Sequence, residues 1–539
     1  MIDEIARKLI YDIHSGKEID ELLKQHNLLD VKYWEPVGGN YNNFPIIDNQ
    51  ATRPDSALGE RIINSVDSLL MRKCQENGIP MTGPQAPKTM WEAAEKFYNI
   101  PGQHLYNMKL EDTIAKLAEI YLCVSGHEGL LPTINLLDLG EGQTPDKIES
   151  TFLSLPSRGS PNKAKIPFVQ GIFNQGSSGS YKFSAYVLIL TKRAPSLLDS
   201  TSSSKDHEWG WTLVKKFETE DEHVSSIFRY LRLDGSTVSS FAADTLPLAP
   251  PIQIGKSLTA TPYDRKIESG TLVKIFDYKL RPLLNSQAWA ELPRIMRRVF
   301  YELPLPVRIY EMRQHLKGQK GDAANLVGMQ YALMSNKKKL EKNFPIPLDL
   351  TIDGVGSLHI DIWAMDFSKG TDQSSRWFGK YAISFIVNGQ SHYDYEKQVL
   401  RRNELDLQNL EGSIYVAVDL SQIPRKKKEV ILKPDRSSVD ESEEFLELQG
   451  QLFSELKNHP VLRALNNKKF EEKTKGADSD EEFTKKVFQR LASANPLIRD
   501  LLLGSNVPVS GGFDWVKVPN KIFVGKASPS FFRLKEKKS

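Results

Sequence analysis

The chain has very little cysteine and no long apolar run. Cys74 and Cys123 are the only cysteines among 539 residues, too few for a disulfide framework or a cysteine-based zinc site. The longest apolar run, near AYVLIL, is far shorter than the ~20 residues that cross a bilayer. The first residues read as an amphipathic helix rather than as a signal peptide (MIDEIARKLIYDIHSGKEIDELL). We therefore expect a cytoplasmic protein in a reducing compartment, with no membrane partner.

The sequence also lacks a strong excess of either charge, and it lacks several known catalytic motifs. Its formal net charge is +3, which for a chain of this length neither indicates nor excludes a nucleic-acid partner. It contains no G-x-x-x-x-G-K-[ST] phosphate loop, no G-x-S-x-G elbow and no metal-ligand cluster with zinc spacing. The length predicts two to four domains.

What is present begins with three polar residues on one predicted helix. The segment from about Ala57 to Glu76 has helical periodicity, and Ser56 could cap it. Glu60, Asn64 and Asp67 are spaced i, i+4 and i+7, which places them on one face. The carboxylate of Glu60 could deprotonate a water, and the carboxamide of Asn64 could bind magnesium. The alternative is the solvated face of an amphipathic helix.

A second motif, PTINLLDLGEG, predicts an apolar strand that ends in a glycine-rich turn. Asp138 stands at the end of this strand, where its carboxylate can accept a hydrogen bond from the exocyclic amine of adenine. Guanine presents a carbonyl at that position. Gly140 and Gly142 would let the backbone pass close to a planar ring. The alternative is an ordinary Asp-Gly turn.

Two further elements follow along the chain. In QGIFNQGSSGSYKFSAYVLIL, Gly176 and Gly179 precede a predicted helix start and then a strand. Free N–H groups at such a start can bind a phosphate, although glycine and serine also mark plain loops. In ESGTLVKIFDYKL, Thr271 begins an alternating strand and could place its hydroxyl beside a base.

These four elements, in this order, resemble the motifs of the GHKL (Bergerat-fold) ATPases. That group includes gyrase B, MutL, the ATP-driven heat-shock chaperones, the MORC proteins and the sensor histidine kinases. The likeness covers about residues 40–280, is weaker over 300–460 and is absent beyond them. It implies a magnesium-dependent ATP hydrolase that works as an ATP-gated clamp, with ATP and Mg2+ as cofactors and a homodimer that forms on ATP binding.

The resemblance also implies roles for single residues. Glu60 matches the general base and Asn64 the magnesium ligand, and Asp67 matches an acidic position beside the nucleotide. Asp138 matches the residue that reads the adenine amine, and Thr271 matches the strand near the base. The glycines of the second and third motifs are matched by Gly140, Gly142, Gly176 and Gly179.

The chain departs from the family pattern at two places. Tyr181 stands where the third motif usually has another glycine. The spacer between the first two motifs is long, and residues 85–130 read as extra helical material of unknown role.

Beyond residue 285 the pattern predicts a second α+β segment. A helix (SQAWAELPRIMRRVFYEL) leads to three strand-like runs (PLDLTIDGVGSLHIDIWAMDF, YAISFIVNG, SIYVAVDL) and a closing helix (SVDESEEFLELQGQLFSELK). This order resembles the transducer domain of gyrase B, MutL and the heat-shock chaperones, in which a basic loop residue senses the γ-phosphate. Lys433 and Arg436 are the candidates for that catalytic role. The alternative is that the basic run RKKK and its surroundings form a solvated loop.

We therefore predict an α+β protein in four parts. Residues 1–40 form an N-terminal helical segment, and residues 41–285 form a two-layer α/β sandwich, the Bergerat ATP-binding fold. Residues 286–460 form a transducer-like α+β domain, and residues 461–539 form a C-terminal helical region with a short β tail. The N-terminal segment either reaches across to a second subunit or docks as a helix pair on the sheet.

Other functions stay open. An ATP-binding scaffold or chaperone-like module would capture a partner protein or DNA with little hydrolysis, and basic stretches near 313–342 and 425–433 could meet phosphate backbones. A sensor kinase needs an upstream phosphoacceptor histidine, and neither His14 nor His26 lies in a segment that looks like such a helix. A nuclease partner and a role in antiviral (phage) defence are expected only because bacterial GHKL proteins of this size often accompany nucleases in phage-defence gene sets.

Overall fold

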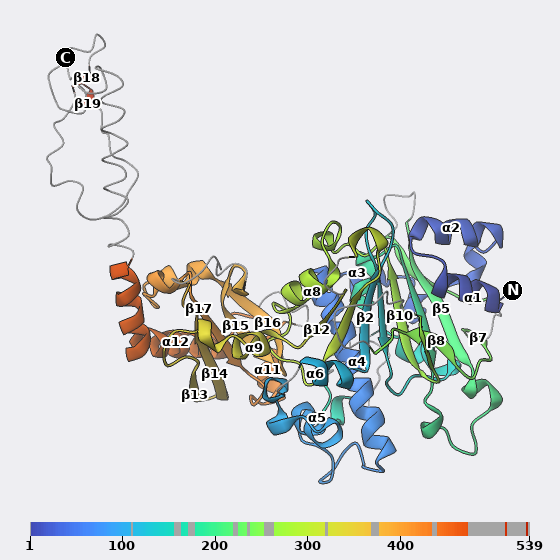
Figure 1. The fold of residues 1–539 in the computed structure, drawn as a ribbon, viewed down its shortest axis with the longest axis horizontal. Helices are drawn as coiled ribbons and strands as arrows, with labels where there is room; N and C mark the ends of the chain where they lie inside the picture. Colours follow the sequence, from blue (N-terminus) through green and yellow to red (C-terminus); the bar gives the residue numbers. More distant parts are fainter. Residues whose placement is uncertain are drawn as a thin grey trace. The chain divides into compact units, whose positions relative to one another are not determined.

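The protein is a mixed α+β protein built on one large sheet (Figure 1). The computed structural model describes residues 2–108, 111–155, 163–170, 178–218, 225–233, 238–252, 263–317, 322–367, 377–433, 439–472, 513–514 and 535–536. Over these residues, a ten-stranded sheet is accompanied by a five-stranded sheet and two strand pairs. No helix in the described ranges is long and apolar enough to cross a membrane.

The ten-stranded sheet is antiparallel except at one pair, β2 with β11. Its strands lie in the order β1-β6-β5-β4-β10-β3-β2-β11-β12, and β7 pairs with β5. In that order they are Trp34–Pro36, Ile227–Leu231, Trp209–Phe217, Tyr186–Lys192, Gly270–Phe276, Thr133–Asp138, Ile120–Ser125, Val307–Glu311 and Ala323–Leu326, with Ser239–Phe241 as β7. The middle strands β4, β10 and β3 are buried at every residue, so helices must cover both faces.

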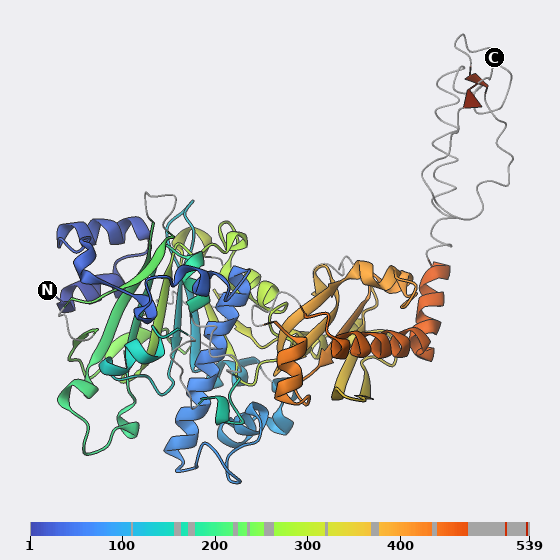
Figure 2. The same ribbon diagram turned by 180° about the vertical axis from the view of Figure 1, so that it is seen from behind.

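Helix α4 (Pro54–Glu76) covers one face, and the short helices α3 (Phe44–Asp48), α5 (Met90–Tyr98) and α7 (Ile148–Thr151) pack into the same core. The predicted helix is confirmed, but it begins at Pro54, one turn before Ala57. Arg53 is its N-cap and Ser56 lies inside the first turn. Proline favours this earlier start because its fixed φ suits the first helical position, where its missing N–H costs no bond. Figure 2, which views the molecule from behind, shows α4 running along the sheet.

Helices α1 (Ile2–Tyr11) and α2 (Gly16–Gln25) cover the opposite face, together with the strand pair β8 (Leu246–Ala249) and β9 (Arg265–Ile267). Helices α1 and α2 therefore pack as a pair on this face of the sheet. Nζ of Lys274, buried in β10, donates to the carbonyl oxygens of Leu9 at 3.0 Å and Ile10 at 2.8 Å. Burial lowers the pKa of this lysine to about 7.

The region 85–130 is only partly the helical addition that we expected. It forms α5 and α6 (Glu111–Leu117), but Ile120–Ser125 is strand β2 of the large sheet. The run IYLCV is buried on both faces, so it lacks the alternation that marks a half-exposed strand. The same sheet continues past residue 285, since β11 and β12 join it beside helix α8 (Ala288–Met296).

The smaller sheet follows with the order β13-β14-β17-β15-β16. Helices α9, α11 and α12 accompany its strands. The strands are Ile346–Ile352, Gly356–Ala364, Ile414–Asp419, Tyr381–Val387 and Gln390–Glu396, and the helices are Met329–Met334, Arg425–Ile431 and Glu443–Asn458. The basic run RKKK is therefore not a loop but the start of α11. Arg425 pairs with Glu429 one turn on at 2.9 Å, and Lys428 is buried with Nζ donating to the carbonyl of Ser421 at 3.0 Å.

Contacts divide the chain into two compact units. One comprises residues 1–399 with 412–453, and the other comprises residues 400–411 with the chain from 454 onward. In the second unit, helical residues 460–472 are tied to the 400–411 segment, since Oδ1 of Asn466 accepts from the backbone N–H of Asn409 at 3.1 Å. A short pair, β18 (Phe513–Asp514) with β19 (Lys535–Glu536), is the described part of the predicted β tail.

Candidate functional site

The polar stripe of α4 points into the protein. Glu60 is 9% exposed and Asp67 is fully buried, whereas Asn64 is half-buried. Glu60 and Asp67 therefore do not belong to a solvated helix face, which was the alternative to a site. Burying a carboxylate is costly unless it is hydrogen-bonded, and both side chains accept hydrogen bonds from glutamines.

Those two glutamines join the carboxylates into one network. Oε1 of Glu60 accepts from Nε2 of Gln390 at 2.8 Å, and Oδ1 of Asp67 accepts from the backbone N–H of Gln170 at 2.8 Å. Nε2 of Gln170 in turn lies 3.3 Å from Oε1 of Gln390. The general-base candidate is thus connected to the second acidic residue of the stripe through the side chain of Gln390 and the side chain and backbone N–H of Gln170, two residues that the sequence did not single out.

Asp138 lies at the end of β3, directly beside α4. Its Oδ2 accepts from the hydroxyl of Ser65 and its Oδ1 from the backbone N–H of Gly140, both at 3.0 Å. Burial raises the pKa of Asp138 to about 7, while these two hydrogen bonds favour the carboxylate and oppose the rise. A desolvated carboxylate with fixed orientation is a strong acceptor for a ligand N–H group.

Thr271 is the direct cross-strand neighbour of Asp138, since β10 pairs with β3 in that register. Paired residues of an antiparallel ladder point to the same face. The hydroxyl of Thr191 donates to the carbonyl of Gly270 at 3.1 Å and accepts from the backbone N–H of Gln143 at 3.0 Å. When Thr191 gives its one hydrogen to Gly270, Thr271 is the donor of the 2.9 Å contact between the two hydroxyls. Thr271 then offers acceptor lone pairs next to Asp138.

The glycine-rich turn after β3 is packed too closely for side chains. Gly142 has φ +60°, and a Cβ there would lie 1.9 Å from the carbonyl oxygen of Lys192. A Cβ on Gly140 would lie 2.1 Å from Oγ of Ser68, and that hydroxyl accepts from the backbone N–H of Glu141 at 3.0 Å. Both glycines of the second motif are therefore required by the fold of the turn itself.

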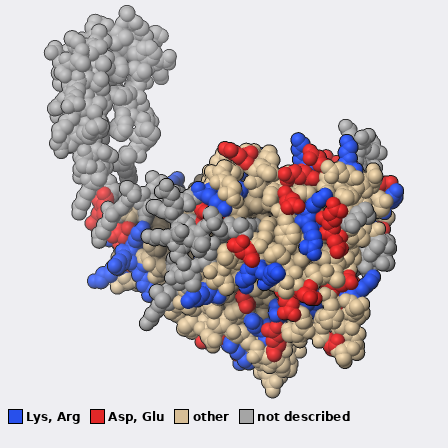
Figure 3. Space-filling view, turned by 45° about the vertical axis from the view of Figure 1, so that its right-hand side comes forward, with Lys and Arg blue, Asp and Glu red and all other residues tan. Residues whose placement is uncertain are grey.

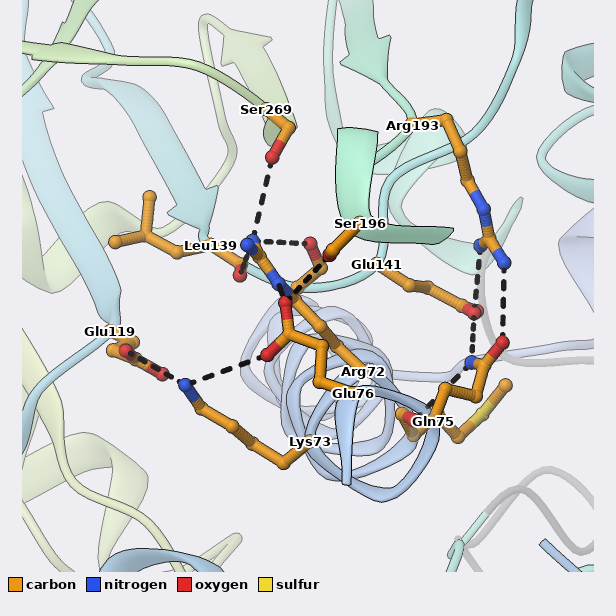
Figure 4. A network of polar contacts seen from close by, with 12 residues as sticks. Arg72, Lys73, Gln75, Glu76, Glu119, Leu139, Glu141, Arg193, Ser196 and Ser269 are labelled. Carbon is orange, nitrogen blue, oxygen red and sulfur yellow. Dashed lines mark hydrogen bonds and ion pairs between the residues drawn. The ribbon is translucent and has the colours of Figure 1, made fainter. Parts of the chain in front are cut away.

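The last turns of α4 fasten this loop in place, as Figure 4 shows. Nη1 of Arg72 donates to the carbonyl of Leu139 at 2.9 Å and to that of Gly140 at 3.3 Å. Glu141 pairs with Arg193 at 2.8 Å and also accepts from Gln75 at 3.2 Å. One helix thus carries the polar stripe over residues 60–67 and holds the glycine-rich turn after β3 with its last turns.

Only part of the third motif lies in the described residues. Gly176 falls outside them, while Gly179 lies in the 3-10 helix Ser178–Phe183, where a Cβ would meet that of Ala51 at 3.1 Å. Tyr181, at the position where the family has another glycine, is 2% exposed and its hydroxyl donates to the carbonyl of Phe152 at 3.1 Å. Its ring also lies 5.3 Å from the guanidinium of Arg61, so this tyrosine fills the core beside α4.

Lys433 and Arg436, the predicted γ-phosphate sensors, stay predictions. Arg436 lies outside the described residues, and Lys433 is exposed just after α11. Gln390 of the smaller sheet contacts Glu60 of the polar stripe. That contact joins residues 330 positions apart, and no local pattern signals it. For Ser65 there was one signal, a hydroxyl on the predicted helix directly after Asn64.

We compared the sequence with protein-family models and with curated proteins, and neither comparison gave a match.

Proposed function

We propose that this chain is a magnesium-dependent ATP hydrolase of the GHKL type. In this proposal the large sheet with α4 is a Bergerat-type ATP-binding fold, and the smaller sheet is its transducer-like partner. The protein would act as a dimeric clamp that ATP closes and hydrolysis reopens. A cytoplasmic location is part of the proposal.

The observation that carries the proposal is the 3.0 Å hydrogen bond from Ser65 to Asp138. It joins the helix that bears Glu60, Asn64 and Asp67 to the strand end that bears the adenine acceptor. The two motifs are 73 residues apart at this contact, and each alone had an ordinary structural explanation. Their direct contact supports a single site.

The base side of this group suits adenine. The carboxylate of Asp138 would accept a hydrogen bond from the exocyclic amine, and Thr271 offers acceptor lone pairs next to it. Guanine would present a carbonyl oxygen to the same carboxylate, so that two acceptors would face each other with no hydrogen between them. We expect adenine nucleotides to be preferred for this reason.

The other end of the stripe suits phosphate hydrolysis. A water that donates a hydrogen bond to the Glu60 carboxylate would attack the γ-phosphorus, and the bond to the β–γ bridging oxygen would break. Glu60 would take the proton of the water. The products are ADP and inorganic phosphate.

The residues present fit magnesium that arrives with the nucleotide. The described ranges contain no group of three or more His, Cys, Asp or Glu side chains that could hold a metal alone. Mg2+ bound to phosphates needs only one or two protein oxygens, and Asn64 lies one turn from Glu60 with a half-buried carboxamide. When bound, the ion would neutralise charge on the phosphate oxygens.

A nucleic-acid partner has less support than ATP. On the face shown in Figure 3, basic and acidic side chains are interspersed. In α11, Lys427 pairs with Glu444 at 3.0 Å and Lys428 is buried, so these cations are already engaged. DNA, a nuclease partner, antiviral defence and a scaffold role with little hydrolysis therefore stay secondary proposals.

The test is ATP hydrolysis by the wild type and by Glu60→Ala, with molar mass measured by light scattering with and without a non-hydrolysable ATP analogue. Loss of a positioned general base should lower turnover by at least about 100-fold. ATP binding and analogue-dependent dimers should persist, because the adenine acceptor Asp138 contacts α4 at Ser65, five residues along the helix from Glu60.

The control is Glu21→Ala, which removes an exposed carboxylate from α2 on the opposite face of the sheet. It should hydrolyse ATP like the wild type. Equal turnover in Glu60→Ala would remove Glu60 as the base. Failure of the wild type to bind ATP would overturn the proposed function.

A further inference from the structure

The tip of the β15–β16 hairpin reaches the carboxylate of Glu60. The two strands are joined by Asn388 and Gly389, with φ +49° and +75°, the positive values that a tight two-residue hairpin turn requires. Gln390 follows this turn, is 1% exposed, and donates from Nε2 to Oε1 of Glu60 at 2.8 Å. The smaller sheet thus inserts a neutral donor beside the general-base candidate.

The orientation of this amide is determined by its neighbours. Nε2 of Gln170 lies 3.3 Å from the carbonyl oxygen of Val387, which can only accept, so that end of Gln170 is the NH2 group. The same NH2 group lies 3.3 Å from the Gln390 side chain, which must therefore present its oxygen to Gln170. The NH2 group of Gln390 then faces Glu60.

The turn that carries Gln390 is held firmly on one side. The carbonyl of Gly389 accepts from the backbone N–H groups of Tyr301 at 2.8 Å and Glu302 at 3.1 Å, and the backbone N–H of Ser391 donates to the carbonyl of Val299 at 2.8 Å. A Cβ on Gly389 would lie 2.4 Å from the carbonyl oxygen of Glu302. The turn is therefore fitted against residues 299–302 with no room for a side chain.

The long spacer between the two motifs contributes to the same support. A Cβ on Gly389 would lie 3.1 Å from Cη2 of Trp91, in α5. From the same spacer, Nδ1 of His104 contacts Oε1 of Glu302 at 2.5 Å. On the opposite side, the hydroxyl of Ser421 accepts from the backbone N–H of Asn388 at 2.7 Å.

We propose that Gln390 is a positioning residue of the hydrolytic site, through which the smaller sheet sets the orientation of Glu60. This inference rests on the proposed ATP hydrolysis. With the hairpin tip seated, the donor fixes one carboxylate oxygen and thereby aims the carboxylate at the attacking water. A shift of the tip removes this donor, so movement of the smaller sheet changes catalysis without touching the nucleotide. The spacer acts as the support that keeps the tip seated.

The experiment compares kcat, KM for ATP and the melting temperature of the wild type, Gln390→Met and Ser421→Ala. Methionine keeps the length of glutamine but cannot donate. Misplacement of a catalytic group by about 1 Å can lower a rate about 100-fold, so we expect kcat of Gln390→Met to fall about 10- to 100-fold. Its KM should stay within about twofold.

Ser421→Ala is a second variant, in case Gln390→Met fails to fold. It removes the acceptor for the backbone N–H of Asn388, which loosens the turn from its far side, and it leaves Gln390 in place. It should lower kcat by a smaller factor. Gln25→Met, on the exposed end of α2, is the control for loss of an amide and should behave like the wild type.

The inference has outcomes that contradict it. An unchanged kcat in Gln390→Met, a raised KM at constant kcat, or a loss of kcat matched by a large fall in melting temperature would each overturn it. In all three cases the wild type still hydrolyses ATP, so the proposed function stands. A wild type without turnover would overturn the function and this inference together.

Discussion

The two ends of the candidate site are built in different ways. The base end consists of the β3 turn, Asp138, Ser65 and Thr271, all from α4 and adjacent strands of one sheet, and each buried polar group there has a partner in the same region. The phosphate end takes Glu60 and Asn64 from the same helix, but its further contact comes from Gln390 in the smaller sheet. The base end is complete within one sheet, whereas the phosphate end depends on a second one.

We therefore expect the two ends to have different roles. In the proposed function, a preformed base end would bind adenine at little cost of ordering. A phosphate end that takes a residue from another sheet can be assembled or dismantled by movement of that sheet. The comparison makes separable predictions, because a change at the base end should affect affinity, and a change behind the phosphate end should affect turnover.

The largest effect is expected from Asp138→Asn. The amide would turn its NH2 toward Ser65, keep the bond from Gly140, and lose the charged acceptor for the adenine amine. A hydrogen bond to a charged group contributes about 1.5–3 kcal/mol, so ATP affinity should fall about 10- to 100-fold. Isothermal titration calorimetry with ATP and GTP measures this, and unchanged ATP affinity would contradict the adenine assignment.

The same variant should be more stable than the wild type at alkaline pH. The pKa of Asp138 is raised in the folded state, so the folded protein holds the proton more tightly than the unfolded chain does. The stability due to this proton is full below about pH 4 and is lost as the pH rises through about 7. Asparagine does not titrate, so its advantage should grow between pH 5 and pH 8, to at most ~4 kcal/mol. Thermal unfolding at several pH values tests the sign.

Helix α4 and strand β3 are the parts of the candidate site that the sequence predicts best. Helical periodicity placed Glu60, Asn64 and Asp67 on one face, and an apolar run ending in Asp138 predicted β3. Both predictions depend on local patterns of side chains, and the structure contains both elements. The strands at 346–352, 356–364, 381–387 and 414–419 were visible for the same reason.

The features that local patterns do not predict depend on tertiary packing. Strand β2 has no polar alternation because both of its faces are buried, and α11 reads as a solvated basic run because its stabilising partner Glu444 comes from another helix. The role of Gln390 is set by a contact across 330 residues. Such contacts leave no periodic trace in a single sequence.

A smaller effect is expected from Arg72→Met, which tests whether α4 holds the turn after β3 in place for ATP binding. Loss of the donors to the carbonyls of Leu139 and Gly140 should lower the free energy of unfolding by about 1–3 kcal/mol. ATP affinity should fall about tenfold, since the turn would have to be ordered on binding. The matched control is Lys73→Met, the next residue on α4, whose ion pairs at 3.9 and 4.0 Å are long and partly exposed and should contribute less than about 1 kcal/mol. Equal effects of the two variants would show that the turn does not depend on Arg72.

The smallest effect is expected at the support of the phosphate end, in His104→Gln. The hydrogen bond with Glu302 raises the pKa of His104, and burial raises the pKa of Glu302 while that hydrogen bond opposes the rise. For a histidine with a raised pKa, the stabilisation is full below about pH 6.5 and is lost as the pH rises through the folded-state pKa. His104→Gln should therefore lower the free energy of unfolding more at pH 6 than at pH 9, by about 1 kcal/mol at most. His127→Gln is the control, because its pair with Glu18 at 2.9 Å is exposed and lies on the α2 side.

If the spacer supports the hairpin tip, His104→Gln should also lower kcat more than it lowers ATP affinity. A larger effect on ATP affinity than on kcat would place this support with the base end.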